Sequence, residues 1–301
     1  DEGEQNVKRI KLTVAYDGTN YCGWQVQPNG ITIEEVLNKK LSKLTGEDIH
    51  IIGASRTDSG VHALGNVAVF DTTSTIPPER FAYAINQRLP EDIVVTQSEE
   101  VPLDWHPRYQ DCTKYYEYHI LNRPLPDPLK RLTTSHVSFP LDEAKMQEAA
   151  NYLIGTHDFK SFCNIRTNTD DTVRTIYSLD VVRDGEEITI YISGNGFLYN
   201  MVRIIAGTLI RVGRGFYQPE QVKEILETKE RTEAGVTAPP QGLRLAKIKY
   251  SSGTCSDEKE PVPDEKNLKI RVFPYFMRVL SVFCSFTSCT CASEHVPNVL
   301  Q

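Results

Sequence analysis

Apolar and polar residues along the first third of the chain follow a pattern that predicts short strands and two helices. Thr32 and Glu35 form a capping box ahead of an amphipathic helix, and Gly46 is placed to end that helix. A second helix is expected to open at Pro77-Pro78 and to end at Pro90. Strands are expected at residues 8–15, 49–52, 66–70 and 93–97.

The pattern repeats its element types, though not its sequence, from about Trp105 onward. Asp142 is placed to cap a helix that Gly155 closes, and Pro219 is placed to open another. Residues 198–212 are apolar almost all round, which predicts a largely buried helix. Strands are expected at residues 114–121, 133–139, 175–182, 188–193 and 243–250, with Asp184-Gly185 as a hairpin turn between the third and fourth of these.

These elements predict an α+β fold made of two ferredoxin-like halves, each of the split βαβ kind. Antiparallel sheets joined edge to edge would leave a central cleft between the halves, which is a common place for a site. The expected divisions are residues 7–104, residues 105–250, and a polar linker and tail over 251–301.

Composition places the chain among globular proteins, since 40% of its 301 residues are apolar and 24% are charged. No run of residues is long and apolar enough for a membrane helix, and no secretory signal is evident, so we expect no membrane contact. Seven cysteines without framework spacing favour a reducing, cytoplasmic location. The net charge of −7 argues weakly against a nucleic-acid partner, although a local basic cleft remains compatible with it.

The segment Gly53–Ala63 carries most of the candidate chemistry. It places a guanidinium (Arg56), a carboxylate (Asp58) and an imidazole (His62) in a loop between two expected strands. Gly, Ser, Asp and Thr are also ordinary turn residues, so composition alone does not decide its role. The string Arg-Thr-Asp-Ser-Gly-Val-His, however, resembles the catalytic signature of the TruA family of tRNA pseudouridine synthases, with Ser59 where the family usually has alanine.

Further segments are similar to motifs of the same family. Residues 196–203 resemble its Phe-Leu-x-x-Met-Val-Arg motif, whose arginine, here Arg203, pairs with the catalytic aspartate. Tyr116 and Tyr118 match a Tyr-x-Tyr pair whose first member contacts the target base. Residues 241–243, ending in Leu243, resemble the closing segment of the family. The resemblance covers about residues 8–250.

The residues themselves leave two interpretations open for these positions. Arg203 lies in an apolar stripe, so it either extends its charged end to water or is a buried cation that requires a carboxylate partner; we favour the second. Tyr116 and Tyr118 share one strand face, where alternating aromatic residues either pack in a core or form a stacking platform for a base.

The resemblance implies an isomerase of the pseudouridine synthase fold that converts uridine to pseudouridine in tRNA, in the anticodon stem-loop at nucleotide positions 38–40. It implies a homodimer that binds tRNA and needs no cofactor and no metal. Asp58 would be the nucleophile, attacking either the base or C1′ of a uridine that has left its stack. The expected catalytic residues are Asp58, Arg203 and Tyr116, and the expected substrate-binding residues are Arg56, Thr57, His62, Tyr118, Asn200 and Leu243.

Other functions remain to be weighed. A non-catalytic RNA-binding protein on the same fold would not need Asp58. A serine hydrolase built from Ser55, His62 and Asp58 would need triad geometry that one loop hardly supplies. A zinc site from Cys284, Cys289, Cys291 and His295 lacks paired spacing and is not expected.

Overall fold

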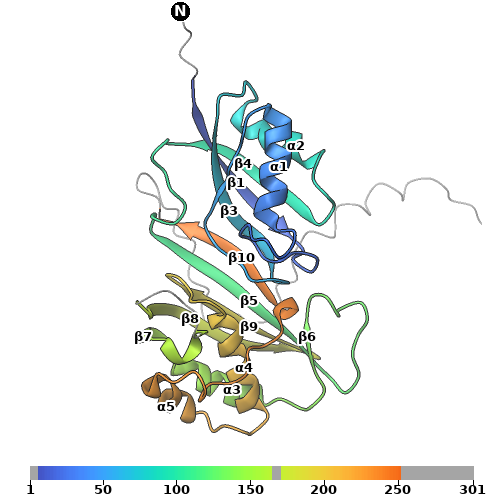
Figure 1. Ribbon diagram of the computed structural model, residues 1–301. Helices are drawn as coiled ribbons and strands as arrows, with labels where there is room; N and C mark the ends of the chain where they lie inside the picture. Colours follow the sequence, from blue (N-terminus) through green and yellow to red (C-terminus); the bar gives the residue numbers. More distant parts are fainter. Residues whose placement is uncertain (1–5, 165–170, 252–301) are drawn as a thin grey trace, which may run out of the picture. The chain divides into compact units, whose positions relative to one another are not determined.

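A ten-stranded sheet runs through the computed structural model, which describes residues 6–164 and 171–251 (Figure 1). The strands are β1 (Lys8–Tyr16), β2 (Ile52–Gly53), β3 (His62–Thr72), β4 (Ile93–Val101), β5 (Cys112–Asn122), β6 (Ser135–Val137), β7 (Gly155–Asp158), β8 (Val173–Asp184), β9 (Glu187–Gly194) and β10 (Leu243–Tyr250). The helices are α1 (Ile33–Thr45), α2 (Phe81–Asn86), α3 (Glu143–Asn151), α4 (Met201–Gly213) and α5 (Gln221–Thr228), with short 3₁₀ turns at Pro78–Arg80, Lys160–Phe162 and Pro240–Gly242.

The strand order confirms the expected fold class. The main path is β4-β1-β3-β10-β5-β9-β8-β7, with β2 paired to β3 and β6 paired to β5. In the first half the strands lie in the order β4-β1-β3-β2. This is the 4-1-3-2 order of the split βαβ arrangement. The second half repeats this order as β10-β5-β9-β8, with β6 and β7 added.

The last strand, β10, joins the two halves. It pairs in parallel with β3 at Arg244 and Leu245, and antiparallel with β5 from Leu243 to Tyr250. Figure 1 shows β10, in orange, between β3 and β5. The joint is therefore a continuous hydrogen-bonded ladder.

Each half has its own apolar core, and β10 contributes to both. Trp24 and Phe81 are fully buried in the core that α1 and α2 cover, and Leu245 reaches this core from β10. Phe159 lies in the core that α3, α4 and α5 cover, together with Leu243. The division into domains at residues 104 and 105 stays a prediction, and residues 252–301 of the expected tail lie outside the described residues.

The capping signals read from the sequence have the expected geometry. Thr32 Oγ1 accepts a hydrogen bond from the Glu35 amide at 3.3 Å, and Gly46 ends α1 with φ of 77°. Asp142 caps α3 by accepting from the Lys145 amide at 3.1 Å. Gly185, with φ of 59°, turns the hairpin between β8 and β9.

Some boundaries differ from those expected. Helix α4 begins at Met201, three residues later than the apolar pattern suggested, because Asn200 adopts a left-handed conformation with φ of 60°. Helix α3 ends at Asn151, and Gly155 instead opens the unexpected strand β7. The expected strand at 49–52 is reduced to Ile52–Gly53.

Helix α4 packs unusually closely against the segment that follows α5. A Cβ atom at Gly207 would lie 1.8 Å from the Val236 carbonyl oxygen, and one at Gly235 would lie 2.6 Å from the Thr208 amide nitrogen. Two glycines that face each other's backbones therefore let the segment run directly along the helix.

We predict that Gly207→Ala lowers the free energy of unfolding by about 1–3 kcal/mol, because backbone must move to admit the methyl group. Gly196→Ala is the matched control, since its Cβ would only touch the Arg174 side chain at 3.8 Å, and it should change stability by less than about 0.5 kcal/mol. Chemical denaturation of both variants measures this. Equal stabilities would show that the close approach at Gly207 is not rigid.

Candidate active site

The loop between β2 and β3 is held from three sides. The Asn66 side chain donates to the Ser55 carbonyl at 3.0 Å and accepts from the Ser55 amide at 3.3 Å. The Trp24 amide donates to the Thr57 carbonyl at 3.0 Å, and the Tyr16 and Thr57 hydroxyls lie 2.7 Å apart. Asp58, which comes next, therefore projects from a fixed backbone.

Helix α4 brings Arg203 to the same place from the other half of the molecule. Arg203 Nε donates to the Ala238 carbonyl at 2.7 Å, and Nη1 donates to Asn200 Oδ1 at 3.0 Å. Arg203 Nη1 lies 3.5 Å from Asp58 Oδ2, and each of the two side chains is only 15% exposed. The structure thus shows a mostly buried cation with a carboxylate partner, the second of the two interpretations of Arg203.

Burial and the ion pair act on Asp58 in opposite directions. Burial raises the pKa of Asp58, and Arg203 opposes that rise through its charge and a hydrogen bond. The pKa stays above its ordinary value, so the carboxylate is less well stabilised than one in water. A less solvated carboxylate is a stronger nucleophile, and Arg203 is the charge that favours its ionised form.

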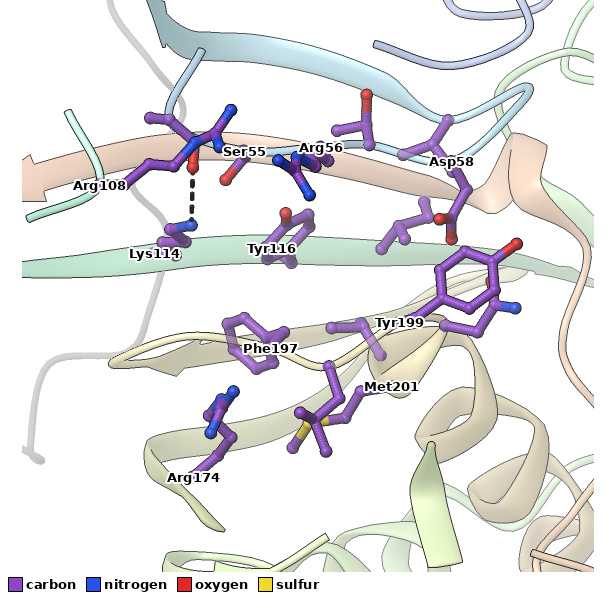
Figure 2. A pocket seen from close by; sticks show the side chains of 17 residues that line it. Ser55, Arg56, Asp58, Arg108, Lys114, Tyr116, Arg174, Phe197, Tyr199 and Met201 are labelled. Carbon is purple, nitrogen blue, oxygen red and sulfur yellow. Dashed lines mark hydrogen bonds between the residues drawn. The ribbon is translucent and has the colours of Figure 1, made fainter. Parts of the chain in front are cut away.

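Asp58 opens into a pocket of about 550 Å³ between the loop, β5 and the start of α4 (Figure 2). Its wall contains four cationic side chains and one carboxylate. The lining residues are Ala54, Ser55, Arg56, Thr57, Asp58, Val61, Arg108, Lys114, Tyr116, Arg174, Phe197, Leu198, Tyr199, Asn200, Met201, Val202 and Leu243.

Tyr116 lies in the middle of the pocket, between Asp58 at one end and Arg108 and Lys114 at the other. Its ring contacts Phe197 edge to face, with 5.2 Å between centroids. Burial raises the pKa of Tyr116 to about 12, and the charge of Asp58 adds to the rise. The phenol is therefore neutral at pH 7 and can donate a hydrogen bond to a polar atom of a ligand.

Seven of the nine residues expected at the site come together around this pocket. Asp58, Tyr116, Arg56, Thr57, Asn200 and Leu243 line it, and Arg203 stands behind Asp58.

The other two, His62 and Tyr118, do not line the pocket. His62 is buried at the start of β3, where Nδ1 accepts from the Gly18 amide at 3.0 Å and Nε2 lies 2.8 Å from the Leu132 carbonyl. The Tyr118 ring is fully buried, and its hydroxyl donates to the Pro239 carbonyl at 2.9 Å. In this structure both side chains brace segments beside the site.

Three cationic residues of the pocket were not singled out from the sequence as site residues: Arg108, Lys114 and Arg174. A signal existed for Lys114, which lies two residues before Tyr116 and so faces the same side of β5. Arg108 and Arg174 come from segments far apart along the chain, and no local pattern marks them.

The serine hydrolase alternative has no support in this geometry. Ser55 Oγ is buried without a hydrogen-bond partner among the residues described, and both ring nitrogens of His62 are engaged elsewhere. No helix within residues 6–164 and 171–251 is long and apolar enough to cross a membrane. The same residues contain no group of three or more side chains suited to hold a metal ion, and the cysteines considered for zinc lie outside them.

The chain is similar in sequence to proteins of known function. A family model described as tRNA pseudouridine synthase matches residues 12–110 and 149–251. The tRNA pseudouridine synthase A of Thermoanaerobacter sp. (strain X514) is 50% identical over 244 residues, which cover 81% of this chain and 100% of that protein. The protein of the same name from Ruminiclostridium cellulolyticum is 51% identical over 245 residues, and that from Brevibacillus brevis is 46% identical over 244, with the same coverage. The chain therefore belongs to the tRNA pseudouridine synthase family.

Proposed function

We propose that this protein isomerises uridine to pseudouridine in the anticodon stem-loop of tRNA, with Asp58 as the nucleophile. The observation that carries the proposal is the mostly buried Asp58–Arg203 pair in the wall of a pocket that also presents Tyr116. The relatives named tRNA pseudouridine synthase A, matched over their full length, support the reaction and the substrate.

The reaction breaks the bond between N1 of uracil and C1′ of ribose, turns the base and forms a bond between C5 and C1′. The proton on C5 is lost and N1 gains one, so atoms balance without an oxidant, a reductant or net hydrolysis. Asp58 acts covalently in this scheme, on the base or on C1′, and its carboxylate leaves again in the second step.

The pocket supports the proposal because its parts match the needs of a flipped uridine. A base must leave its stack before an enzyme can reach C1′ or C5, and the energy of unstacking has to be recovered in the pocket. Tyr116 and Phe197 offer aromatic surface and Tyr116 a polar hydroxyl, while Asp58 is the pocket's one carboxylate. Arg56, which is exposed and lines the pocket, would fill the vacated stack or bind a phosphate.

A non-catalytic RNA-binding protein is the remaining alternative. Release of tritium from tRNA labelled with 5-³H-uridine separates the two, because only replacement of the C5 proton releases it. We expect the amount of tritium released to equal the amount of pseudouridine formed. If the wild-type protein bound tRNA but released no tritium, the non-catalytic alternative would be established.

The finer parts of the proposal rest on the motif resemblance: the target nucleotides in the anticodon stem-loop, a homodimeric assembly and a cytoplasmic location. Mapping pseudouridine in the product tRNA tests the first, and light scattering of the purified protein tests the second.

Asp58→Asn should abolish tritium release while tRNA binding is kept, since an amide is isosteric with the carboxylate but is no nucleophile. The measurement is single-turnover release with enzyme in excess over tRNA, beside an equilibrium binding assay. Release at the wild-type rate by contaminant-free variant would remove Asp58 from the mechanism.

The same variant should show a pH-dependent gain in stability. Because the folded-state pKa of Asp58 is raised, its protonated form stabilises the fold below the unfolded pKa of about 3.9, and this contribution is lost as pH rises through the folded pKa. The stability of Asp58→Asn relative to wild type should therefore increase as pH rises through that window. Urea denaturation of both proteins at a series of pH values measures this difference. If the stability of Asp58→Asn relative to wild type fell as pH rose, the effect of Arg203 on the pKa of Asp58 would outweigh that of burial.

Arg203→Leu should lose turnover at neutral pH and recover part of it as pH rises. Leaving a buried carboxylate charged and unpaired costs about 3–5 kcal/mol, and Asp58 can avoid much of that cost by binding a proton. Its pKa then rises further, and the protonated acid is not a nucleophile.

The matched control is Arg211→Leu, at the other end of α4, where the guanidinium binds the Tyr217 hydroxyl at 2.7 Å. This control should keep the wild-type pH–rate profile. If Arg203→Leu also kept that profile, the ion pair would not govern ionisation of the nucleophile.

A further inference from the structure

The end of the pocket away from Asp58 is crowded with positive charge. Figure 2 shows Arg108 and Lys114 at one end, Arg174 below them and Asp58 at the other end, with Tyr116 between. Lys114 and Tyr116 are two residues apart on one face of β5, which separates their Cα atoms by about 7 Å. The pocket thus has a nucleophilic end and a cationic end.

Among the described residues these cations have little anionic compensation, although the charge of Glu34 acts on Arg108. Within the described parts of the chain, Arg108 and Lys114 form no ion pair, and Arg174 has only the largely exposed Asp171, at 3.7 Å. Burial lowers the pKa of Lys114, and the charges of Arg108 and Arg174 lower it further. Like charges gathered in a partly buried place cost stability unless a ligand neutralises them.

The catalytic loop fixes two of the three side chains from its first residues. Arg108 Nε donates to the Gly53 carbonyl at 2.7 Å, and Lys114 Nζ donates to the Ala54 carbonyl at 3.2 Å. An ammonium group has three donors and a guanidinium has five, so each group retains donors for a ligand. The segment that positions them leads directly to Asp58.

We infer that Lys114, Arg108 and Arg174 form a subsite for one backbone phosphate adjacent to the uridine that Asp58 attacks. This inference rests on the proposed function. Phosphodiesters are the anionic groups of RNA, and the planar fork of arginine matches two phosphate oxygens. A phosphate bound at this end leaves Tyr116 and the Asp58 end of the pocket free for the base and sugar of the adjacent uridine.

The test compares full-length wild-type protein with Lys114→Gln, which removes the charge and keeps a polar side chain. Counterion release makes the logarithm of the tRNA association constant fall with the logarithm of salt concentration, and each phosphate contact adds about 0.7–0.9 to that slope. Lys114→Gln should weaken binding and make the slope less negative by about this amount. Lys114→Arg should restore both.

Lys247→Gln is the matched control, because Lys247 is a cation on the neighbouring strand that stacks over Tyr115 on the other sheet face. It should leave the affinity and the slope unchanged. The subsite would be overturned if the salt dependence of Lys114→Gln equalled that of the wild type. It would also be overturned if Lys114→Gln and Lys247→Gln made the slope less negative by the same amount.

A second measurement locates the phosphate. In tRNA assembled from a synthetic fragment, each phosphate flanking the modified uridine is replaced in turn by a neutral methylphosphonate. At one position the loss of affinity should be large with wild-type protein and clearly smaller with Lys114→Gln, since one of the three cationic contacts to that phosphate is already gone. If the effect of each methylphosphonate simply added to the effect of Lys114→Gln at every position, the inference would be overturned. Tritium release by the wild-type protein would still support the proposed function in that case.

Discussion

The ion pair between Asp58 and Arg203 is the constraint on which the site depends. Its two members belong to different halves of the molecule, and each is 15% exposed. Arginine suits this place because it does not release its proton when it is buried. The Ala238 carbonyl and the Asn200 side chain also bind the guanidinium, so its position does not depend on Asp58 alone. Burial nevertheless leaves the pKa of Asp58 raised, so its charged form is less well stabilised than that of a carboxylate in water.

The local charge around this ion pair is opposite in sign to the net charge of the protein. The chain carries a net charge of −7, yet Arg56, Arg108, Lys114 and Arg174 line one pocket. At physiological salt, exposed charges that lie farther apart than about 8 Å are largely screened from one another, so distant acidic residues weaken this local field little. A protein of acidic composition can therefore present a local surface that attracts a polyanion.

The sequence predicted what is specified locally. Caps at Thr32 and Gly46 and the turn at Gly185 depend on neighbouring residues, so their positions were correct. Strand alternation placed Tyr116 and Tyr118 on one face, but only the tertiary packing decides that Tyr116 meets the pocket and Tyr118 the core. The late start of α4 follows from the left-handed backbone at Asn200, which the apolar pattern did not reveal, and the gathering of distant arginines depends on tertiary folding, which no local pattern encodes.

The position of β10 has a consequence for synthesis of the protein. It is the last strand of the described chain, it joins β3 to β5, and its first residue, Leu243, lines the pocket. A nascent chain that has reached residue 242 already contains the nucleophile and its counter-ion, but lacks the strand that holds their two halves together. The pocket can therefore be completed only after β10 has been synthesised, so a nascent chain that ends before β10 has no assembled pocket with which to bind RNA.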